Sequence, residues 1–158
     1  MEFLVLIIVI VILFFIAKNY RTEQFKNINL KRKEFFSGDI LNHEAGLLVA
    51  LLAKVAKADG KIGELEAELI KQTFTDVSSH FENEQEVRGR LKELYNKEKD
   101  NFSNLIVLCD RLYILTKNNY ESRLTYLEYL LNLAFIDGSF SKTEREITED
   151  IAQALKIE

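Results

Sequence analysis

The 158-residue sequence contains no proline, and it has only one cysteine, two histidines and six glycines. Because proline interrupts helices, its absence allows helices to run without breaks, and strand patterns bounded by Gly or Pro turns are scarce. The single cysteine, Cys109, excludes a disulfide within the chain, and its apolar helical surroundings indicate a core residue. No zinc-ligand spacing or phosphate-binding loop is present, and His43 and His80 are expected to be solvated. We therefore expect an all-α protein that is not an enzyme.

Charge is distributed unevenly along the chain. Residues 1–33 carry six Lys or Arg and two Glu, whereas residues 34–158 carry 15 Lys or Arg and 23 Asp or Glu. The net charge is therefore +4 in the first part and −8 in the second. General binding of nucleic acid requires a basic surface, which the acidic body of the chain lacks. Nucleic acid is not an expected partner.

The N-terminal segment contains an unbroken apolar run from Phe3 to Ala17. Three interpretations are open: a cleaved signal peptide, a buried core helix and a retained membrane anchor. The run follows an acidic residue, Glu2, rather than a basic region, and it contains no polar residue, which disfavours the first two. The run is slightly shorter than the roughly 20 residues of a usual transmembrane helix, but its flanks can extend it into the interfaces. We predict a transmembrane anchor over residues 1–20.

Basic residues follow the apolar run and none precedes it: Lys18, Arg21, Lys26, Lys31, Arg32 and Lys33. The positive-inside rule then places Met1 outside and the rest of the chain in the cytoplasm. We expect a single-pass protein of a bacterial-type inner membrane, with residues 21–38 as a basic juxtamembrane tether and residues 39–158 as a helical domain. The basic residues either contact anionic lipid headgroups or only fix the topology.

Apolar residues recur at helical spacing after the tether, with breaks near Gly38, Gly60, residues 78–79, Asn101, residues 118–119 and Gly138. Residues 83–98 are highly charged with a thin apolar stripe, which indicates a surface helix. Residues 102–115 are apolar on much of their surface, which predicts a central helix. Together these patterns predict a compact bundle of six or seven helices. The expected apolar faces comprise Leu47, Leu48, Leu51, Leu52, Val55 and Ala56; Leu65, Leu69, Ile70 and Phe74; Val87, Leu91, Leu94 and Tyr95; Leu124, Leu127, Leu130, Leu131 and Ala134; and Ile147, Ile151 and Leu155.

The predicted domain contains an internal sequence repeat, with one copy near each of its ends. Residues 56–66 (AKADGKIGELE) align with residues 134–144 (AFIDGSFSKTE), so that each segment reads as a helix, an Asp-Gly turn, an apolar residue and a second helix. Glycine can adopt the left-handed conformation that ends a helix, and the Asp side chain can accept hydrogen bonds from the turn. Ser141 with Glu144 forms a capping-box pattern, and Gly63 with Glu66 forms a weaker one. The sequence predicts two similar helix hairpins.

The same spacing matches the second half of an EF-hand calcium loop. The first half should supply ligands two and four residues before each Asp, but Lys57 and Val55, and Phe135 and Leu133, stand there. A full EF-hand is therefore excluded. Capping of the following helix and a looser site for a divalent cation remain as alternatives.

The doubled pattern ALLAKVAKADGKIGELE and LLNLAFIDGSFSKTERE resembles the TerB-like domain of the tellurite-resistance TerB superfamily. This resemblance implies a cytoplasmic helical bundle associated with tellurite resistance and stress. Acidic metal sites proposed in that family would correspond to Asp59, Glu66, Asp137 and Glu144. The order of anchor, basic tether and helical domain is similar to the N-terminal part of DjlA-type membrane-anchored co-chaperones related to DnaJ.

One departure from the co-chaperone pattern affects the expected partner. DjlA-type proteins carry a J domain whose His-Pro-Asp tripeptide stimulates Hsp70, and a sequence without proline contains no such tripeptide. Hsp70 is therefore an expected partner only through a J domain outside these residues. We expect an anchored interaction or regulatory module that binds a protein partner or self-associates. It is either part of a longer co-chaperone or a stand-alone TerB-like protein that binds a divalent metal in the stress response.

Overall fold

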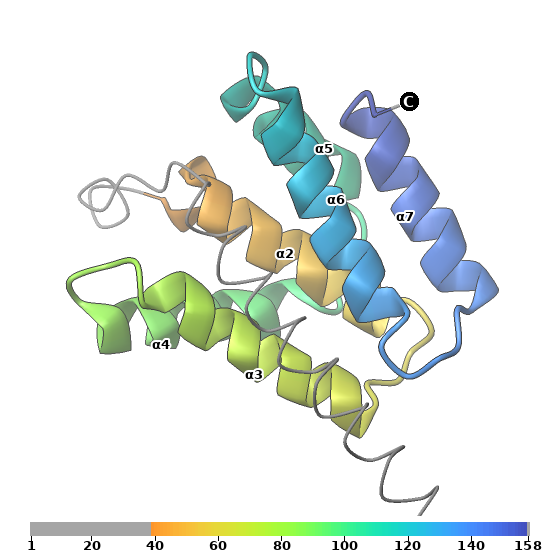
Figure 1. The fold of residues 1–158 in the computed structure, drawn as a ribbon, viewed down its shortest axis with the longest axis horizontal. Coiled ribbons are helices and arrows are strands. Elements are labelled where there is room, and N and C mark those ends of the chain that lie inside the picture. Colours follow the sequence, from red (N-terminus) through yellow and green to blue (C-terminus); the bar gives the residue numbers. More distant parts are fainter. Residues whose placement is uncertain (1–38, 158) are drawn as a thin grey trace, which may run out of the picture.

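The computed structural model describes residues 39–157, which form six α-helices and one short 3-10 helix without any strand (Figure 1). The expected all-α fold is confirmed for this part of the chain. The predicted anchor and the predicted tether, residues 1–38, lie outside the described residues. The elements are η1 (Ile40–Asn42), α2 (Glu44–Lys57), α3 (Glu64–Ser78), α4 (Glu84–Glu98), α5 (Leu105–Leu115), α6 (Tyr120–Ala134) and α7 (Lys142–Ala154).

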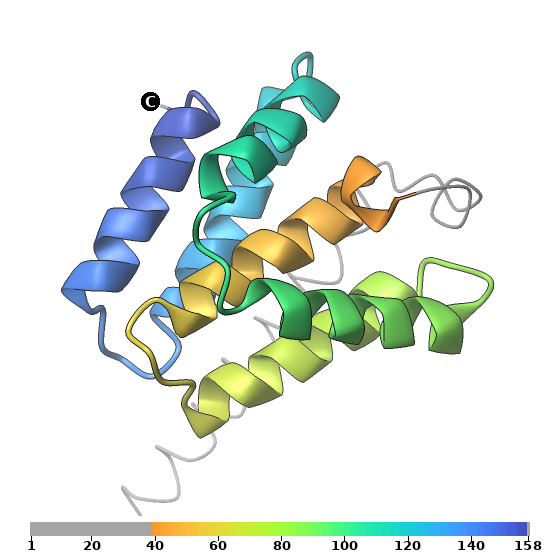
Figure 2. The same ribbon diagram turned by 180° about the vertical axis from the view of Figure 1, so that it is seen from behind.

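Helix α2 is the centre of the bundle. Every residue from Ala45 to Ala56 is buried, and α2 contacts each of the other five α-helices. Helices α3 and α4 lie on one side of α2, and α5, α6 and α7 lie on the other (Figures 1 and 2). Small residues such as Gly46 and Ala50 alternate with leucines along α2, so that neighbouring helices can approach it from several directions.

Local side chains account for the packing of α4 and for the start of α2. The expected stripe on α4 is buried at Val87, Leu91, Leu94 and Tyr95, which confirms a surface helix that packs through one narrow face. His43 was expected to be solvated but is half-buried, because its Nδ1 atom accepts the Ala45 N–H at 3.1 Å and caps α2. The His43 and Phe81 rings also pack edge to face, with 5.8 Å between their centroids.

The prediction that residues 102–115 form the central helix is wrong. Helix α5 fully buries only Leu108, Cys109 and Leu112. Leu105 and Tyr113 are half-buried against the core, and its other apolar side chains are exposed. Helices α2 and α5 are both apolar on nearly every side. Helix α2 has the small residues that permit packing all round, whereas α5 carries mainly large ones. Leu65 and Leu124 were also expected to face the core, and both are exposed.

Cys109 is fully buried, as predicted for a core residue. Burial raises the pKa of its thiol to about 12, and the nearby carboxylates of Asp110 and Asp150 add to the shift. The thiolate is therefore scarce at neutral pH, and Cys109 is a packing residue. Within residues 39–157, no helix combines the length and the hydrophobicity needed to cross a membrane.

Two glycines inside helices offer a matched pair of substitutions. A Cβ atom at Gly46 would lie 2.0 Å from the backbone oxygen of Ile40, whereas nothing lies within 4 Å of a Cβ atom at Gly89. We predict that Gly46→Ala lowers the free energy of unfolding by about 1–3 kcal/mol, because η1 must move away from α2. Gly89→Ala should raise it by about 0.5–1 kcal/mol, because alanine restricts the unfolded chain. Urea unfolding of the full chain in nonionic detergent measures both, and a shift in the same direction would contradict the close approach of η1.

Candidate functional site

The two Asp-Gly segments form similar turns, one between α2 and α3 and the other between α6 and α7. Gly60 and Gly138 have φ angles of 85° and 79°, which is the left-handed conformation expected of them. Asp59 Oδ1 accepts the Lys61 N–H at 2.9 Å, and Asp137 Oδ1 accepts the Ser139 N–H at 2.9 Å. Each aspartate therefore fixes its own turn through a bond to a residue two positions later.

The glutamates that follow these turns cap the next helices. Glu66 Oε2 accepts the Gly63 N–H at 2.6 Å, and Glu144 Oε2 accepts the Ser141 N–H at 2.8 Å. In the second hairpin Ser141 Oγ also accepts the Glu144 N–H at 3.1 Å, which completes the capping box. Gly63 has no side chain to return this bond, so the first hairpin has only half of the box, as the sequence predicted.

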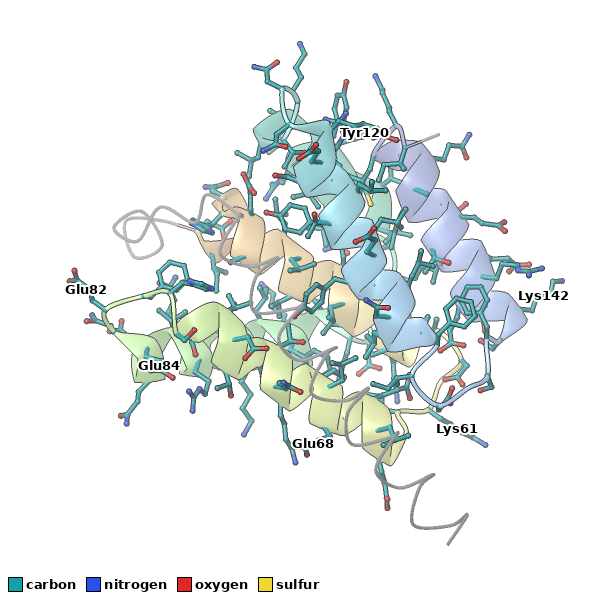
Figure 3. The ribbon with its side chains drawn as sticks, in the orientation of Figure 1. Lys61, Glu68, Glu82, Glu84, Tyr120 and Lys142 are labelled. Atoms are coloured by element: carbon teal, nitrogen blue, oxygen red, sulfur yellow. The ribbon has the colours of Figure 1, made fainter. Side chains whose placement is uncertain are left out.

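The two turns lie side by side at one end of the bundle (Figures 1 and 2). Lys61 in the first turn and Lys142 at the start of α7 mark this end, and Tyr120 lies at the opposite end (Figure 3). Burial raises the pKa of the Glu66 carboxyl, although the Gly63 N–H counteracts it, and the carboxylates of Glu144, Asp137 and Asp59 raise it further. The fold therefore brings Glu66 close enough to the other three acidic residues singled out in the sequence for their charges to interact.

Residues 46–158 match the family model described as tellurite resistance protein TerB. The chain belongs to the TerB family. The match begins two residues inside α2 and includes both Asp-Gly hairpins and helices α3 to α7, so the TerB domain accounts for nearly all of the described structure.

Two curated relatives of the TerB domain are named co-chaperone protein DjlA. The protein from Vibrio vulnificus strain YJ016 is 29% identical over 106 residues, and the protein from strain CMCP6 is 28% identical over 106 residues. Each match covers 67% of this chain and 36% of the relative. The chain therefore spans about a third of the length of these relatives, 36%. No solved structure matches the chain.

The four acidic residues do not form a closed cation site in the TerB domain as described. Between residues 39 and 157, no three or more His, Cys, Asp or Glu side chains converge in a way that could hold a metal ion. One oxygen of each carboxylate is used by a turn or a helix cap. Their capping role is thus visible in the structure, and metal binding stays a prediction.

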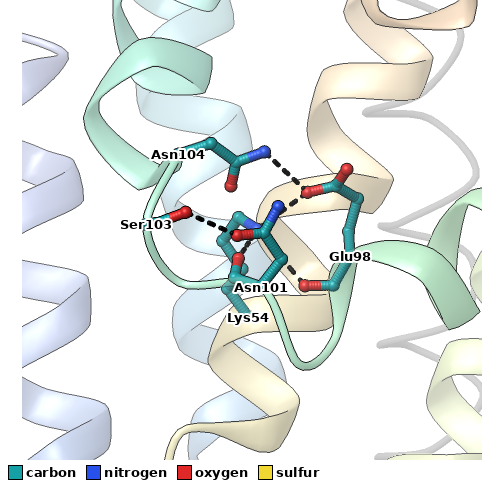
Figure 4. Close-up of polar contacts among 5 residues, drawn as sticks. All are labelled: Lys54, Glu98, Asn101, Ser103 and Asn104. Carbon is teal, nitrogen blue, oxygen red and sulfur yellow. Dashed lines mark hydrogen bonds and ion pairs between the residues drawn. The ribbon is translucent and has the colours of Figure 1, made fainter.

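A buried polar cluster that the sequence analysis missed joins three helices (Figure 4). Lys54 of α2 is 0% exposed, and its Nζ atom donates to Glu98 Oε2 at 2.9 Å, to the Glu98 carbonyl oxygen at 3.2 Å and to the Asn101 carbonyl oxygen. Asn104, at the start of α5, donates its Nδ2 hydrogen to Glu98 Oε2 at 2.9 Å. The cluster ties the middle of the bundle to the end of α4 and the beginning of α5.

This cluster satisfies the demands of a buried ammonium group. All three donors of Lys54 have oxygen acceptors. One is the carbonyl of Glu98, the last residue of α4, where the helix dipole favours a cation, and another is the carbonyl of Asn101 in the loop that follows. The sequence held a signal for both partners. Lys54 falls on the apolar face of Leu47, Leu51 and Val55, and Glu98 continues the stripe that ends at Leu94 and Tyr95. A lysine and a glutamate at such positions indicate a buried pair.

The cluster also determines how Glu98 titrates. Burial by itself raises the pKa of the Glu98 carboxyl, but hydrogen bonds from Asn104 and Lys54 and the positive charge of Lys54 outweigh it. The pKa therefore lies below its ordinary value of 4.5. A carboxyl whose pKa is lowered by folding stabilises the protein above its ordinary pKa, and this contribution is lost as the pH falls through the folded-state value.

Removing one member of the pair should cost far more than removing both. We predict that Lys54→Met lowers the free energy of unfolding by about 3–5 kcal/mol, because Glu98 stays buried without its cation. The double variant Lys54→Met with Glu98→Leu should recover most of that loss, because neither charge of the pair is then left buried. Urea unfolding of the full chain in nonionic detergent gives these values.

The pH dependence supplies the control for this prediction. Wild-type stability should fall as the pH drops below about 4.5, while Lys54→Met should lose the part of that fall that comes from Glu98. Lys71→Met is a matched control, because Lys71 pairs with Glu68 on the surface with 74% of its side chain exposed. Similar losses at Lys54 and Lys71, or unchanged acid profiles, would contradict the role of the buried pair.

Proposed function

We propose that this chain is a single-pass membrane protein that holds a TerB domain on the cytoplasmic side as a non-enzymatic interaction and regulatory module, related to the N-terminal part of DjlA-type co-chaperones. The observation that carries the proposal is the similarity of the TerB domain to proteins named co-chaperone DjlA, at 29% identity over 106 residues. The apolar run at residues 3–17 and the basic residues that follow it support the anchored arrangement.

In a co-chaperone, these 158 residues would have a role other than the stimulation of Hsp70. Stimulation of Hsp70 would require a J domain, and its His-Pro-Asp tripeptide is not among these 158 residues. The N-terminal run would instead locate the protein at the inner membrane, and the TerB domain would contact a protein partner or another copy of itself. Sequencing the gene beyond the codon for Glu158 distinguishes a longer co-chaperone from a stand-alone anchored protein of the stress response.

Membrane attachment is tested by two charges placed in the apolar run. We predict that the wild-type chain sediments with membranes and leaves them only in detergent. Ile8→Lys with Ile12→Lys should release it, because each lysine at the centre of a transmembrane helix costs about 2.5–3.5 kcal/mol. Ultracentrifugation of cell lysates with immunoblotting measures the partition.

The matched control, Ile8→Leu with Ile12→Leu, keeps the run apolar and should remain in the membrane fraction. Added protease should spare the TerB domain in intact spheroplasts and digest it in inverted vesicles, if the domain is cytoplasmic. A wild-type chain that stays in the supernatant without detergent would refute the anchor, and digestion in spheroplasts would refute the orientation.

The negative charges near Glu66 favour a second candidate function, the binding of a divalent cation between the two turns. Glu144, Asp137 and Asp59 all raise the pKa of the Glu66 carboxyl, and a bound cation would relieve their mutual repulsion. The free oxygens of these four carboxylates, which do not converge in the structure as described, would have to turn toward a shared cation to bind it. The related role would be that of a metal-responsive protein in the tellurite or stress response.

Calorimetry with calcium, magnesium and manganese on the full chain in detergent tests this candidate. We predict measurable binding that is lost in Asp59→Asn with Asp137→Asn, because asparagine keeps the oxygen that accepts the turn N–H but loses the charge. The matched control, Asp100→Asn with Asp150→Asn, removes two exposed charges outside the turns. Absence of heat and of any thermal shift with all three cations would reject the metal role and leave the anchored-module proposal intact.

A further inference from the structure

Helix α5 exposes a row of large apolar side chains. Ile106 is 52% exposed, Val107 53%, Ile114 69% and Leu115 45%. Single exposed apolar residues are ordinary, but four on one side of a short helix indicate an interaction surface. In Figure 2 helix α5 lies on the near side of the molecule with no described helix in front of it.

These residues share one half of the helix. At about 100° per residue, the arc that contains Ile106 and Leu115 also contains Val107, Asp110, Arg111 and Ile114. Leu108, Cys109 and Leu112 fall on the opposite half and are buried. We call the six outward residues the α5 face. Asp110 and Arg111 are both exposed and form the only charged positions of the face, at its centre.

The α5 face is complementary to itself when the helix is reversed. Its residues form three pairs that are equidistant from the point between positions 110 and 111: Ile106 with Leu115, Val107 with Ile114, and Asp110 with Arg111. In a contact between two identical molecules related by a two-fold axis, residue i of one meets residue j of the other, and j meets i. An axis through this point would therefore place apolar residues against apolar residues and each aspartate against an arginine.

The charges also select the direction of packing. Two parallel α5 helices in register would set Asp110 against Asp110 and Arg111 against Arg111, which is repulsive. An antiparallel pair replaces both repulsions by two ion pairs at the centre, with apolar contacts on either side. This arrangement matches the reversed symmetry of the face, and an unrelated partner would not require that symmetry.

We propose that α5 is a homodimer interface, in which the α5 faces of two molecules pack antiparallel about a two-fold axis that passes between Asp110 and Arg111. The interface consists of described residues alone, so it does not depend on the membrane attachment proposed above. The exposed apolar row becomes buried in the dimer, and Arg111 of one molecule pairs with Asp110 of the other.

Charge reversal tests the pairing. Sedimentation equilibrium of the full chain in nonionic detergent should show a dimer. D110R and R111D should each raise its dissociation constant about tenfold or more, because like charges then meet at both central positions. An equimolar mixture of D110R and R111D should restore the dimer, because the two arginines of one variant face the two aspartates of the other. Circular dichroism should show unchanged folding, since both positions are exposed.

Disulfide trapping separates this interface from any association through the N-terminal run. V107C mixed with I114C should give a crosslinked pair on mild oxidation, whereas V107C alone should not, because the two positions 107 lie apart in an antiparallel pair. Native Cys109 is fully buried and does not interfere. L65C, at a residue of α3 that is 58% exposed, is the matched control. A monomeric wild type, a mixture that fails to restore the dimer, or equal crosslinking of V107C alone and of the mixture would overturn the proposal.

Discussion

The bundle depends on how the charge of Lys54 is held inside it. Helix α2 is surrounded on every side, so its one lysine in the buried stretch has no route to water and must find partners within the protein. Its partners are the carboxylate and carbonyl of Glu98 and the carbonyl of Asn101, and Asn104 adds a hydrogen bond to the same carboxylate. The end of α4 and the start of α5 must therefore meet next to the middle of α2. A purely apolar core would not impose this register on the two helices.

The conformation of the two repeated hairpins is fixed instead by contacts between residues that are close in sequence. Asp59, Glu66, Asp137 and Glu144 each bond a backbone N–H within three residues of themselves. The fold then brings both turns to the same end, where the carboxylates repel each other and the pKa of Glu66 rises, chiefly through burial. Ionisation of Glu66 thus opposes folding at a pH above its folded-state pKa, while the cap it forms favours folding. The acidic residues of the two turns thus help to start the following helices and at the same time repel one another.

The separation of two residues along the chain decides how well the sequence predicts their interaction. The turns, the capping box and the stripe on α4 were predictable because the residues involved lie within one or two helical turns of one another. The exposed position of α5 was not, since α2 and α5 are both apolar in sequence. The small residues of α2 give it the central position only when several helices pack against it. The Lys54–Glu98 pair joins residues 44 positions apart, so each partner shows a signal in its own helix but the pairing itself does not.

The same competition for the centre explains why an apolar face is left on the surface. Once α2 occupies the middle, α5 can bury only the side that holds Leu108, Cys109 and Leu112, and its other side must face outward. Exposure of large apolar residues is unfavourable in an isolated molecule, so their retention requires a reason outside the core. A second molecule supplies one, because the reversed order of the α5 face matches apolar with apolar and acid with base. Attachment of both molecules to one membrane would raise their effective concentration and favour this contact without any change in the interface.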